Sequence, residues 1–570
     1  MTRPGIALLT SLASLGLFLV LLRPNQSPSH QVAADHTAAA APDPTPNKEN
    51  PEAVILAWQG SGLAPPRSKT LQSEIKAFDE WVLVLNAVKD DTPLTPAQIE
   101  EGIRLAEARR PVLKQLIQTD PEAALAAAVP WVIRNRLPTE ILDLLEDRVS
   151  ATADFSVLAA VPRPGQTLDS PALTRTAVID GQVMQAYVYG DKEAVDTKQN
   201  LPVDGISIDD QLAILDATLR PLEEGEPIQG PLEPVISPQH DPGESAIETE
   251  NWVYGGSYYE LCCGTHTATL QRELELSASS PGPEFAPATS GFEVSQSSWT
   301  EGTKSLLVIR VDFSDLAGAP RDSSNNVIDA AYLVQRVNDE IADWIEEVSY
   351  SKGSMTLGSS DVTGVLRMPQ TAATYAAGYL NDSLRIDALA LASSNGFNPD
   401  NYDRVALVFS DLSSLPASLI TYGGLGQVGG SFTWYNGNFS FGIATHEFGH
   451  NYGLRHANRW QIPGASSNPV DPSGSSTEYG DVFDMMGSGP SDPSTNADHF
   501  NPWFLNRLDW LTDSSIQTVS TGGTYRIYRY DHQNANAANP LALKIDRSAS
   551  ENYWIGYRRK FAGHPSRGDV

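Results

Sequence analysis

The stretch Ser305-Leu-Leu-Val-Ile-Arg-Val-Asp-Phe313 is almost continuously apolar and rich in β-branched residues. Such a run is typical of a strand buried on both faces of a sheet. Asp403-Arg-Val-Ala-Leu-Val-Phe409 has the same character and predicts a second buried strand. Between them, residues 328–348 and 380–392 carry apolar side chains at helical spacing. This order of strands and helices predicts a mixed α/β layer.

Shorter segments complete this predicted layer. Residues 354–357 and 362–368 read as strands, and the alternating residues 429–435 read as an edge strand. Residues 443–452 predict a helix. After Asp513 the pattern turns to strands, expected at residues 524–530, 541–545 and 553–558. The expected fold class is therefore α+β or mixed α/β, with a twisted mixed sheet and a β-rich tail.

The region before this layer begins with helical patterns. One helix is expected from Pro138 to Val149, with proline in its first turn. Residues 175–189 alternate instead and predict a hairpin that turns at Asp180-Gly181. No group of chemically active residues stands out in this helix-rich part. A pro-region or accessory domain is the expected interpretation.

The 570 residues suggest two to four domains. Composition shifts give the expected boundaries: a signal peptide or membrane anchor at 1–34, a linker at 35–51, the pro-region or accessory domain at 52–222, a linker containing Cys262 and Cys263 at 223–300, the mixed-sheet domain at 301–513, and a β-rich region at 514–570. The last region ends directly after a strand-like run, and we expect it to be truncated or degenerate.

Charge and the N-terminus restrict the partners. The chain has 39 basic and 70 acidic residues, a net charge of −31, which argues against nucleic acid or an anionic membrane surface. Residues 5–22 are apolar and uncharged between Arg3 and Arg23. They predict an export signal, either cleaved or kept as an anchor, and hence a secreted or cell-surface protein. Membrane contact is expected only if this segment stays uncleaved.

The densest group of reactive side chains is Thr445-His-Glu-Phe-Gly-His-Asn-Tyr-Gly-Leu-Arg-His456. It holds three of the ten histidines within eleven residues, which a packing role for a lone histidine does not explain. His446 and His450, four residues apart, lie on one face of a helix. Gly453 permits the turn that ends the helix and returns His456 to the same place.

Three neutral imidazoles that leave one coordination position open are typical of a catalytic zinc site. Zinc would activate a water molecule and polarise a peptide carbonyl. Glu447 follows the first ligand and lies where it would take the proton of that water and later pass a proton to the leaving amine. The pattern predicts metal ligation by His446, His450 and His456, and general-base catalysis by Glu447.

His-Glu-x-x-His-x-x-Gly-x-x-His resembles the signature of metzincin zinc peptidases. The segment Asp484-Met-Met-Gly487 is similar to the methionine turn of gametolysin-like members, which would make Met486 the turn methionine, with Met485 as the alternative. The residues from His499 to Leu511 resemble the following helix of gametolysin-like and immune-inhibitor-A-like enzymes. No tyrosine of the kind that astacin-like enzymes place after the turn is present. The resemblance covers roughly Lys304 to Leu511.

The resemblance implies a secreted zinc endopeptidase, made as a zymogen, that cleaves extracellular proteins. A different reading keeps the zinc but not the reaction, in a surface binding or adhesion protein with an inactive metzincin domain. The presence of Glu447 favours the enzyme. Protein is the expected substrate, with cell-wall or matrix glycoprotein as the alternative.

Several residues outside the motif have two interpretations each. Cys262 or Cys263 would cap the zinc in a latent form, as matrixin pro-regions do with Cys-Gly, or the pair forms a vicinal disulfide or two buried thiols. Four acidic residues lie in a Gly/Ser-rich loop and would bind Ca²⁺ or form a solvated loop: Asp471, Glu478, Asp481 and Asp484. His499 is expected to pack rather than bind metal.

Overall fold

The computed structural model describes residues 71–558, apart from 88–92, 164–167, 169–170, 235–249, 262–269, 271–297, 379, 465, 467, 469–470, 488–498 and 549–550. The expected signal or anchor, the linker at 35–51 and both cysteines lie outside these residues. Pro65–Val570 forms one unit by its internal contacts. In the described part of the chain, no helix combines the length and apolar character that a membrane span requires.

The predicted mixed sheet is confirmed, and the molecule is α+β. The strands that were expected in the C-terminal half are β10 (Gly302–Asp312), β11 (Gly353–Thr356), β12 (Val362–Arg367), β13 (Arg404–Phe409) and β15 (Phe432–Asn436). β10, β13 and β15 run parallel, and β14 (Gly424–Gln427) pairs antiparallel with β15. Every residue of β13 is buried, as its continuous apolar sequence predicts.

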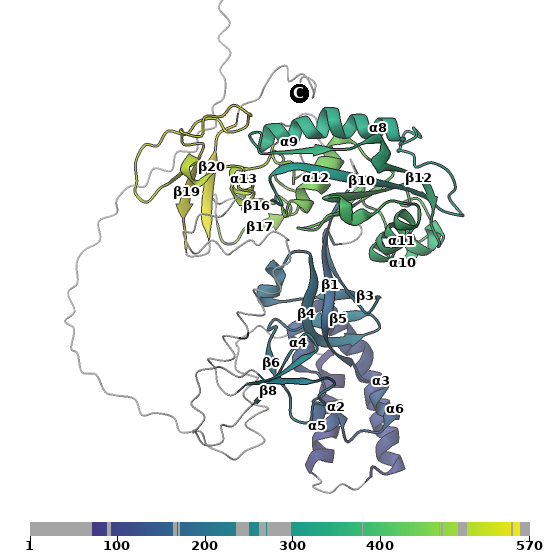
Figure 1. The fold of residues 1–570 in the computed structure, drawn as a ribbon. Coiled ribbons are helices and arrows are strands. Elements are labelled where there is room, and N and C mark those ends of the chain that lie inside the picture. Colours follow the sequence, from purple (N-terminus) through teal and green to yellow (C-terminus); the bar gives the residue numbers. More distant parts are fainter. Residues whose placement is uncertain are drawn as a thin grey trace, which may run out of the picture. The chain divides into compact units, whose positions relative to one another are not determined.

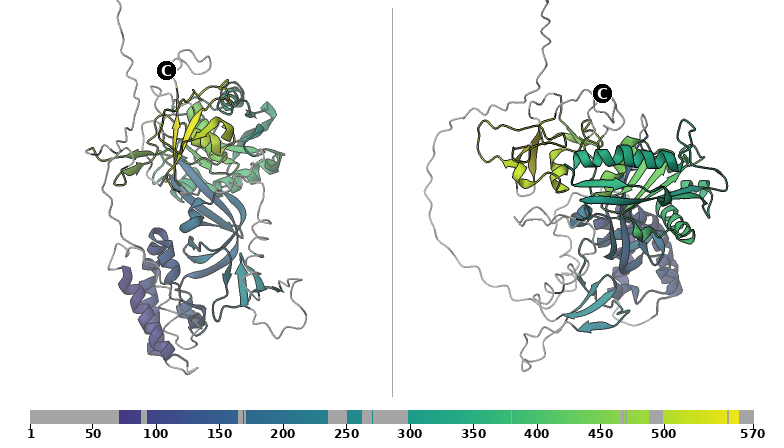
Figure 2. Two further views of the ribbon diagram at one scale, coloured as in Figure 1. Left: turned by 90° about the vertical axis from the view of Figure 1, so that its left-hand side faces the viewer. Right: turned by 45° about the horizontal axis from the view of Figure 1, so that its top comes forward.

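Helices cover both faces of these strands (Figure 1; Figure 2, right). One face packs against an interrupted helix and against α12 (Phe441–Asn451) through Leu306 and Val308 of β10. The interrupted helix consists of α8 (Ala330–Gln335), a π-helical turn (Arg336–Ile341) and α9 (Ala342–Val348). The opposite face packs through Leu307 and Ile309 against α10 (Ala372–Gly378) and α11 (Asn381–Ser394). The alternation of side chains along β10 thus divides two cores.

From Leu71 on, the described N-terminal residues form α2 (Leu71–Ala87), α3 (Pro96–Thr119), α4 (Pro121–Ala126), α5 (Trp131–Arg134) and α6 (Thr139–Leu142). Five strands follow: β1 (Asp147–Val161), β2 (Leu173–Ile179), β3 (Gln182–Tyr187), β4 (Lys198–Ile208) and β5 (Gln211–Ile214). The predicted hairpin is confirmed, because Asp180 and Gly181 turn between β2 and β3 with φ of 49° and 82°. The helix predicted to reach Val149 is wrong in length: α6 ends at Leu142, and Val149 lies in β1, where it pairs with β4.

Two further expectations need correction. Residues 429–435 were expected at a sheet edge, but β15 lies between β13 and β14 and is entirely buried, and β1 continues the same sheet beyond β14. Residues 524–530 form no strand; Arg529 makes only an isolated bridge to Tyr557. The alternating residues there do not pair along their length with a neighbouring strand.

Smaller sheets complete the described fold. The range expected as a linker, 223–300, contains β7 (Leu232–Pro234), β8 (Glu250–Tyr254) and β9 (Ser257–Leu261), which form a four-stranded sheet with β6 (Arg220–Pro221). The loop after α12 forms β16 (Arg459–Gln461) with β17 (Ser475–Thr477). The C-terminal part contains α13 (Pro502–Arg507), β18 (Ile516–Thr518), β19 (Ala542–Asp546) and β20 (Asn552–Gly556).

Candidate metal centre

Helix α12 carries the first part of the motif and ends where the sequence predicts. Gly453 has a φ of 101°, a conformation that residues with a side chain rarely adopt. Its amide donates to the His450 carbonyl, and the Leu454 amide donates to the Gly449 carbonyl. This capping reverses the chain immediately after the helix, and His456 is thereby brought back beside His446 and His450.

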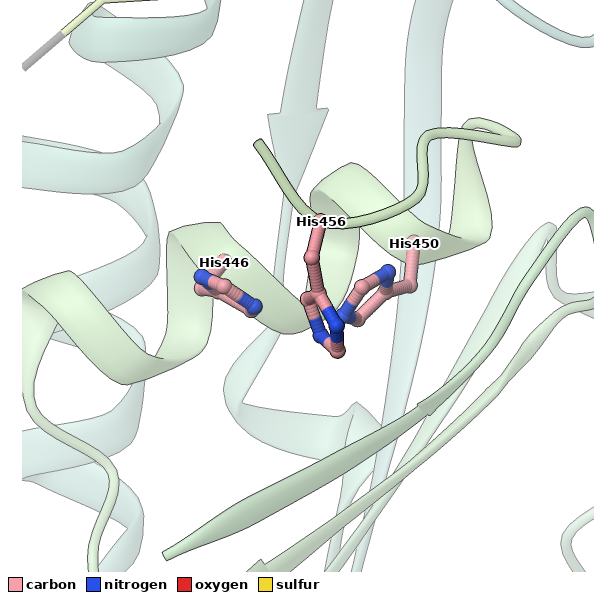
Figure 3. Close-up of side chains that lie close together, drawn as sticks. All are labelled: His446, His450 and His456. Carbon is pink, nitrogen blue, oxygen red and sulfur yellow. The ribbon is translucent and has the colours of Figure 1, made fainter. Parts of the chain in front are cut away.

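The three imidazoles converge (Figure 3). The His446 and His450 rings lie 4.8 Å apart, as do those of His450 and His456, and the third pair lies 5.5 Å apart. One potential ligand atom from each histidine lies within 4.8 Å of the other two, and in the described residues no other group of three or more His, Cys, Asp or Glu side chains converges in this way. His446 and His450 are fully buried, and the His456 side chain is 3% exposed.

Hydrogen bonds decide which nitrogen of each ring faces the centre. Nδ1 of His446 bonds the Met485 carbonyl at 2.8 Å, and Nδ1 of His450 bonds the Leu454 carbonyl at 2.8 Å. Nδ1 of His456 bonds Oε1 of Glu478 at 2.6 Å. Because carbonyl and carboxylate oxygens only accept, each Nδ1 carries the proton, and each Nε2 presents a lone pair. All three Nε2 atoms are buried without a hydrogen-bond partner.

The surroundings keep these rings neutral. Burial, with the neighbouring His456, lowers the pKa of His446 to about 3, and burial also lowers the pKa of His450 and of His456. Neutral imidazole is the form that binds a metal ion. Buried polar atoms without partners are rare in folded proteins, and three converging lone pairs could hold a metal ion. The donor set of three nitrogens and an open fourth position fits zinc.

Glu447 lies beside this centre in an equally unusual state. It is fully buried, neither carboxyl oxygen has a hydrogen-bond partner in the structure, and burial raises its pKa well above the ordinary value. Strand β14 passes close to it: a Cβ atom on Gly424 would overlap the Glu447 carboxyl group, and one on Gly426 would lie 2.9 Å from the His450 Cβ. Only glycine lets this strand approach the helix so closely.

The predicted methionine turn lies under the helix. The Met486 amide donates to Oδ1 of Asp484 at 2.8 Å, and Met485 holds His446 through its carbonyl. Both methionines are buried, and a Cβ atom on Gly449 would collide with the Met486 sulfur. The two methionines therefore have different roles. Met485 orients His446, whereas Met486 packs directly against the helix backbone.

Two residues beside the centre were not assigned to it from the sequence. Glu478 accepts hydrogen bonds from Nδ1 of His456 at 2.6 Å and from the Asn458 amide group at 2.8 Å. The ring of Tyr479 lies 4.2 Å from that of His456. A histidine that binds a metal usually has such an outer partner, but sequence spacing does not say which acidic residue of a loop supplies it.

The other predicted residues lie apart from the three histidines. Asp471 accepts hydrogen bonds from the Ser466 and Ser473 hydroxyls. Asp481 accepts a hydrogen bond from the Phe483 amide. Asp484 is buried and caps the methionine turn, so the four acidic residues proposed for Ca²⁺ do not converge in the described structure. His499 is buried and its ring lies 5.6 Å from that of Tyr530.

Comparison with family models finds none that matches this chain, and comparisons with curated proteins and with solved structures find no match either.

Proposed function

We propose that this chain is a zinc-dependent endopeptidase of the metzincin type that resembles gametolysin-like enzymes. The observation that supports it most is the set of orphaned buried atoms: three converging Nε2 lone pairs, next to a glutamate with no partner for either oxygen. A structural zinc site would be closed by a fourth protein ligand, whereas an open position and an adjacent carboxylate suit hydrolysis.

The roles follow from the chemistry of each group. His446, His450 and His456 would hold the ion through Nε2. When bound, zinc would polarise a peptide carbonyl and lower the pKa of water towards about 7. The Glu447 carboxylate would accept a proton from the attacking water and return it to the leaving amine nitrogen. Glu478 would keep His456 in the required tautomer.

A polypeptide substrate is supported by strand β14. It runs antiparallel to β15 and passes Glu447 at Gly424. Extended peptides pair with sheet strands through main-chain hydrogen bonds, and a peptide paired with β14 in the place that β1 occupies would run past Glu447. The apolar segment at residues 5–22 supports export, so the proposed substrates are extracellular proteins or glycoproteins.

The test compares the parent chain with Glu447→Ala, each treated to sever residues before Ser298. Zinc is measured by mass spectrometry, and hydrolysis of a denatured protein mixture is measured with and without a chelator. We expect about one zinc per chain in both proteins and chelator-sensitive hydrolysis only in the parent. Equal hydrolysis by both proteins, or none by either, would contradict the proposal.

A further inference from the structure

Strand β1 belongs to two sets of strands at once (Figure 1). Its residues Asp147–Phe155 pair with β4, and Asp154–Ala159 pair with β2, both in the N-terminal region. Its last four residues, Leu158–Val161, pair antiparallel with β14. One strand therefore starts among N-terminal strands and ends on the strand that lies beside Glu447.

The register brings the end of β1 next to the proposed reaction centre. Val161 faces Gly424, the glycine whose Cβ position overlaps the Glu447 carboxyl, and Ala159 faces Gly426. Flanking bonds extend the pairing, because the Gly423 amide donates to the Val161 carbonyl at 2.9 Å and the Val428 amide to the Val157 carbonyl at 2.8 Å. The hydrogen-bonding groups of β14 that face away from β15 are thus used by β1.

The residues around the three histidines also hold β1 and its neighbours. The Tyr479 hydroxyl donates to the Ala160 carbonyl, while its ring lies against His456. Arg455, inside the histidine motif, donates to the Glu193 and Val195 carbonyls and to Asp196. These contacts tie the motif itself to the N-terminal region.

Just beyond β1, a third contact fixes the chain. Arg163 donates to the Asn436 carbonyl and pairs with Asp411 at 2.6 Å. The end of β1 is also buried on both faces: Leu158 and Ala160 pack with Leu425 and Trp434, and Val161 packs with Ile443. Such burial and pairing make spontaneous departure of the strand rare.

We propose that β1 is a built-in inhibitor that occupies the β14 edge in the place of an extended substrate peptide. The inference rests on the proposed function. An edge strand has one open side, so β1 and a substrate cannot both pair with β14. Peptide access requires the Leu158–Val161 segment to leave, and the Tyr479 hydroxyl, released from Ala160, then becomes available to a substrate carbonyl at the same position.

The experiment locks or frees this strand in the full chain. Cys262 and Cys263 are replaced by Ser, and a cleavage site for a sequence-specific protease is inserted between Leu270 and Ser298. Ala160→Cys and Leu425→Cys then place two thiols on facing positions of β1 and β14, at a separation that antiparallel pairs share with disulfides. Oxidation locks β1 on the edge, and reduction allows it to leave.

The probe is a fluorescein-labelled synthetic peptide with the sequence of residues 154–163, whose binding to the edge does not depend on zinc. After cleavage of the insert, we expect it to bind the reduced protein at least about tenfold more tightly than the oxidised protein, because apparent affinity scales with the fraction of open edge. A peptide with Ala159→Pro, which lacks an amide donor, should bind neither form. The protein with Ala160→Cys alone should not respond to oxidation.

The outcomes separate this inference from the proposed function. Equal binding of the peptide to both forms, including no binding to either, would overturn the inhibitor role of β1. Hydrolysis of denatured casein by the reduced, cleaved protein and by its Glu447→Gln counterpart is measured in the same samples. Lock-dependent peptide binding without Glu447-dependent hydrolysis would leave β1 as the occupant of the edge and would contradict the endopeptidase.

Discussion

Among the described residues two glutamates are fully buried, and they show opposite ways of burying a carboxyl group. Glu146, after helix α6, pairs with Arg109 at 2.6 Å and accepts the Val129 amide at 2.7 Å. Glu447, in helix α12, has no partner for either oxygen. Burial acts to raise the pKa of Glu146, but the Arg109 charge and hydrogen bonds bring its pKa below the ordinary value, whereas burial alone raises that of Glu447.

Glu146 is a structural group with its own counter-charge, whereas Glu447 has none within the described residues. An unpaired buried carboxylate costs several kcal/mol, so a folded chain normally supplies a counter-charge, as Arg109 does. Near Glu447, the described residues that lack hydrogen-bond partners include the Tyr435 hydroxyl and the three imidazole lone pairs, and none of these groups supplies a positive charge. A counter-charge from outside the chain is what the proposed zinc ion would supply. The following predictions test this contrast.

The largest expected effect is on the reaction. Glu447→Gln keeps the shape of the side chain and removes its ability to accept a proton. We expect hydrolysis by the activated protein to fall by about 10²- to 10⁴-fold. Zinc content should not change, and neither should thermal unfolding of the zinc-free protein, because the Glu447 oxygens have no hydrogen-bond partner to lose. A large loss of stability instead would place Glu447 with Glu146 as a structural group.

The second prediction concerns the structural partner. Glu146→Gln leaves the Arg109 charge, which is 1% exposed, without its counter-charge. We expect the free energy of unfolding to fall by about 3–5 kcal/mol, measured by urea denaturation. Zinc binding by the folded protein should not change. A loss below about 1 kcal/mol would show that water or the Asp79 carboxyl compensates the Arg109 charge.

The third prediction concerns the outer partner of a proposed ligand. Glu478→Gln weakens the hydrogen bond that fixes the His456 ring. We expect zinc affinity to fall by about 10- to 100-fold, measured by competition with a chromogenic chelator. Asp471→Asn is the matched control: it removes the same charge from the same loop, but its carboxylate bonds serines rather than a histidine. Equal losses in both variants would mean that net charge, not orientation, controls affinity.

These residues also show how far sequence alone predicted this molecule. Strand β13 was predictable because every side chain is buried, and a strand buried on both faces is apolar throughout. The turn at Asp180-Gly181 was predictable because two successive residues there have positive φ. The convergence of His446, His450 and His456 followed from helix geometry and Gly453, all within eleven residues.

What could not be predicted depends on distant partners. The edge position expected for residues 429–435 was wrong because β14 and β1 add to the sheet beyond it, and β1 comes from more than 250 residues earlier in the chain. Glu478 was considered only for Ca²⁺, although it binds His456. The sequence of a Gly/Ser-rich loop does not indicate which of its acidic residues will contact a histidine. Local patterns specify local geometry, whereas the partners of an edge or a carboxylate are set by the tertiary fold.

The smallest expected effect tests whether burial is the variable that matters. Lys76 and Glu80 form an ion pair at 3.6 Å on helix α2, with side chains 75% and 65% exposed. Glu80→Gln makes the same change of charge as Glu146→Gln in the same helical region, but water solvates both partners. We expect a loss of less than about 0.5 kcal/mol in urea denaturation, and a smaller one at high salt. A loss similar to that of Glu146→Gln would indicate that removal of any acidic group destabilises these helices, and the contrast between Glu146 and Glu447 would then no longer identify a buried group that awaits a ligand.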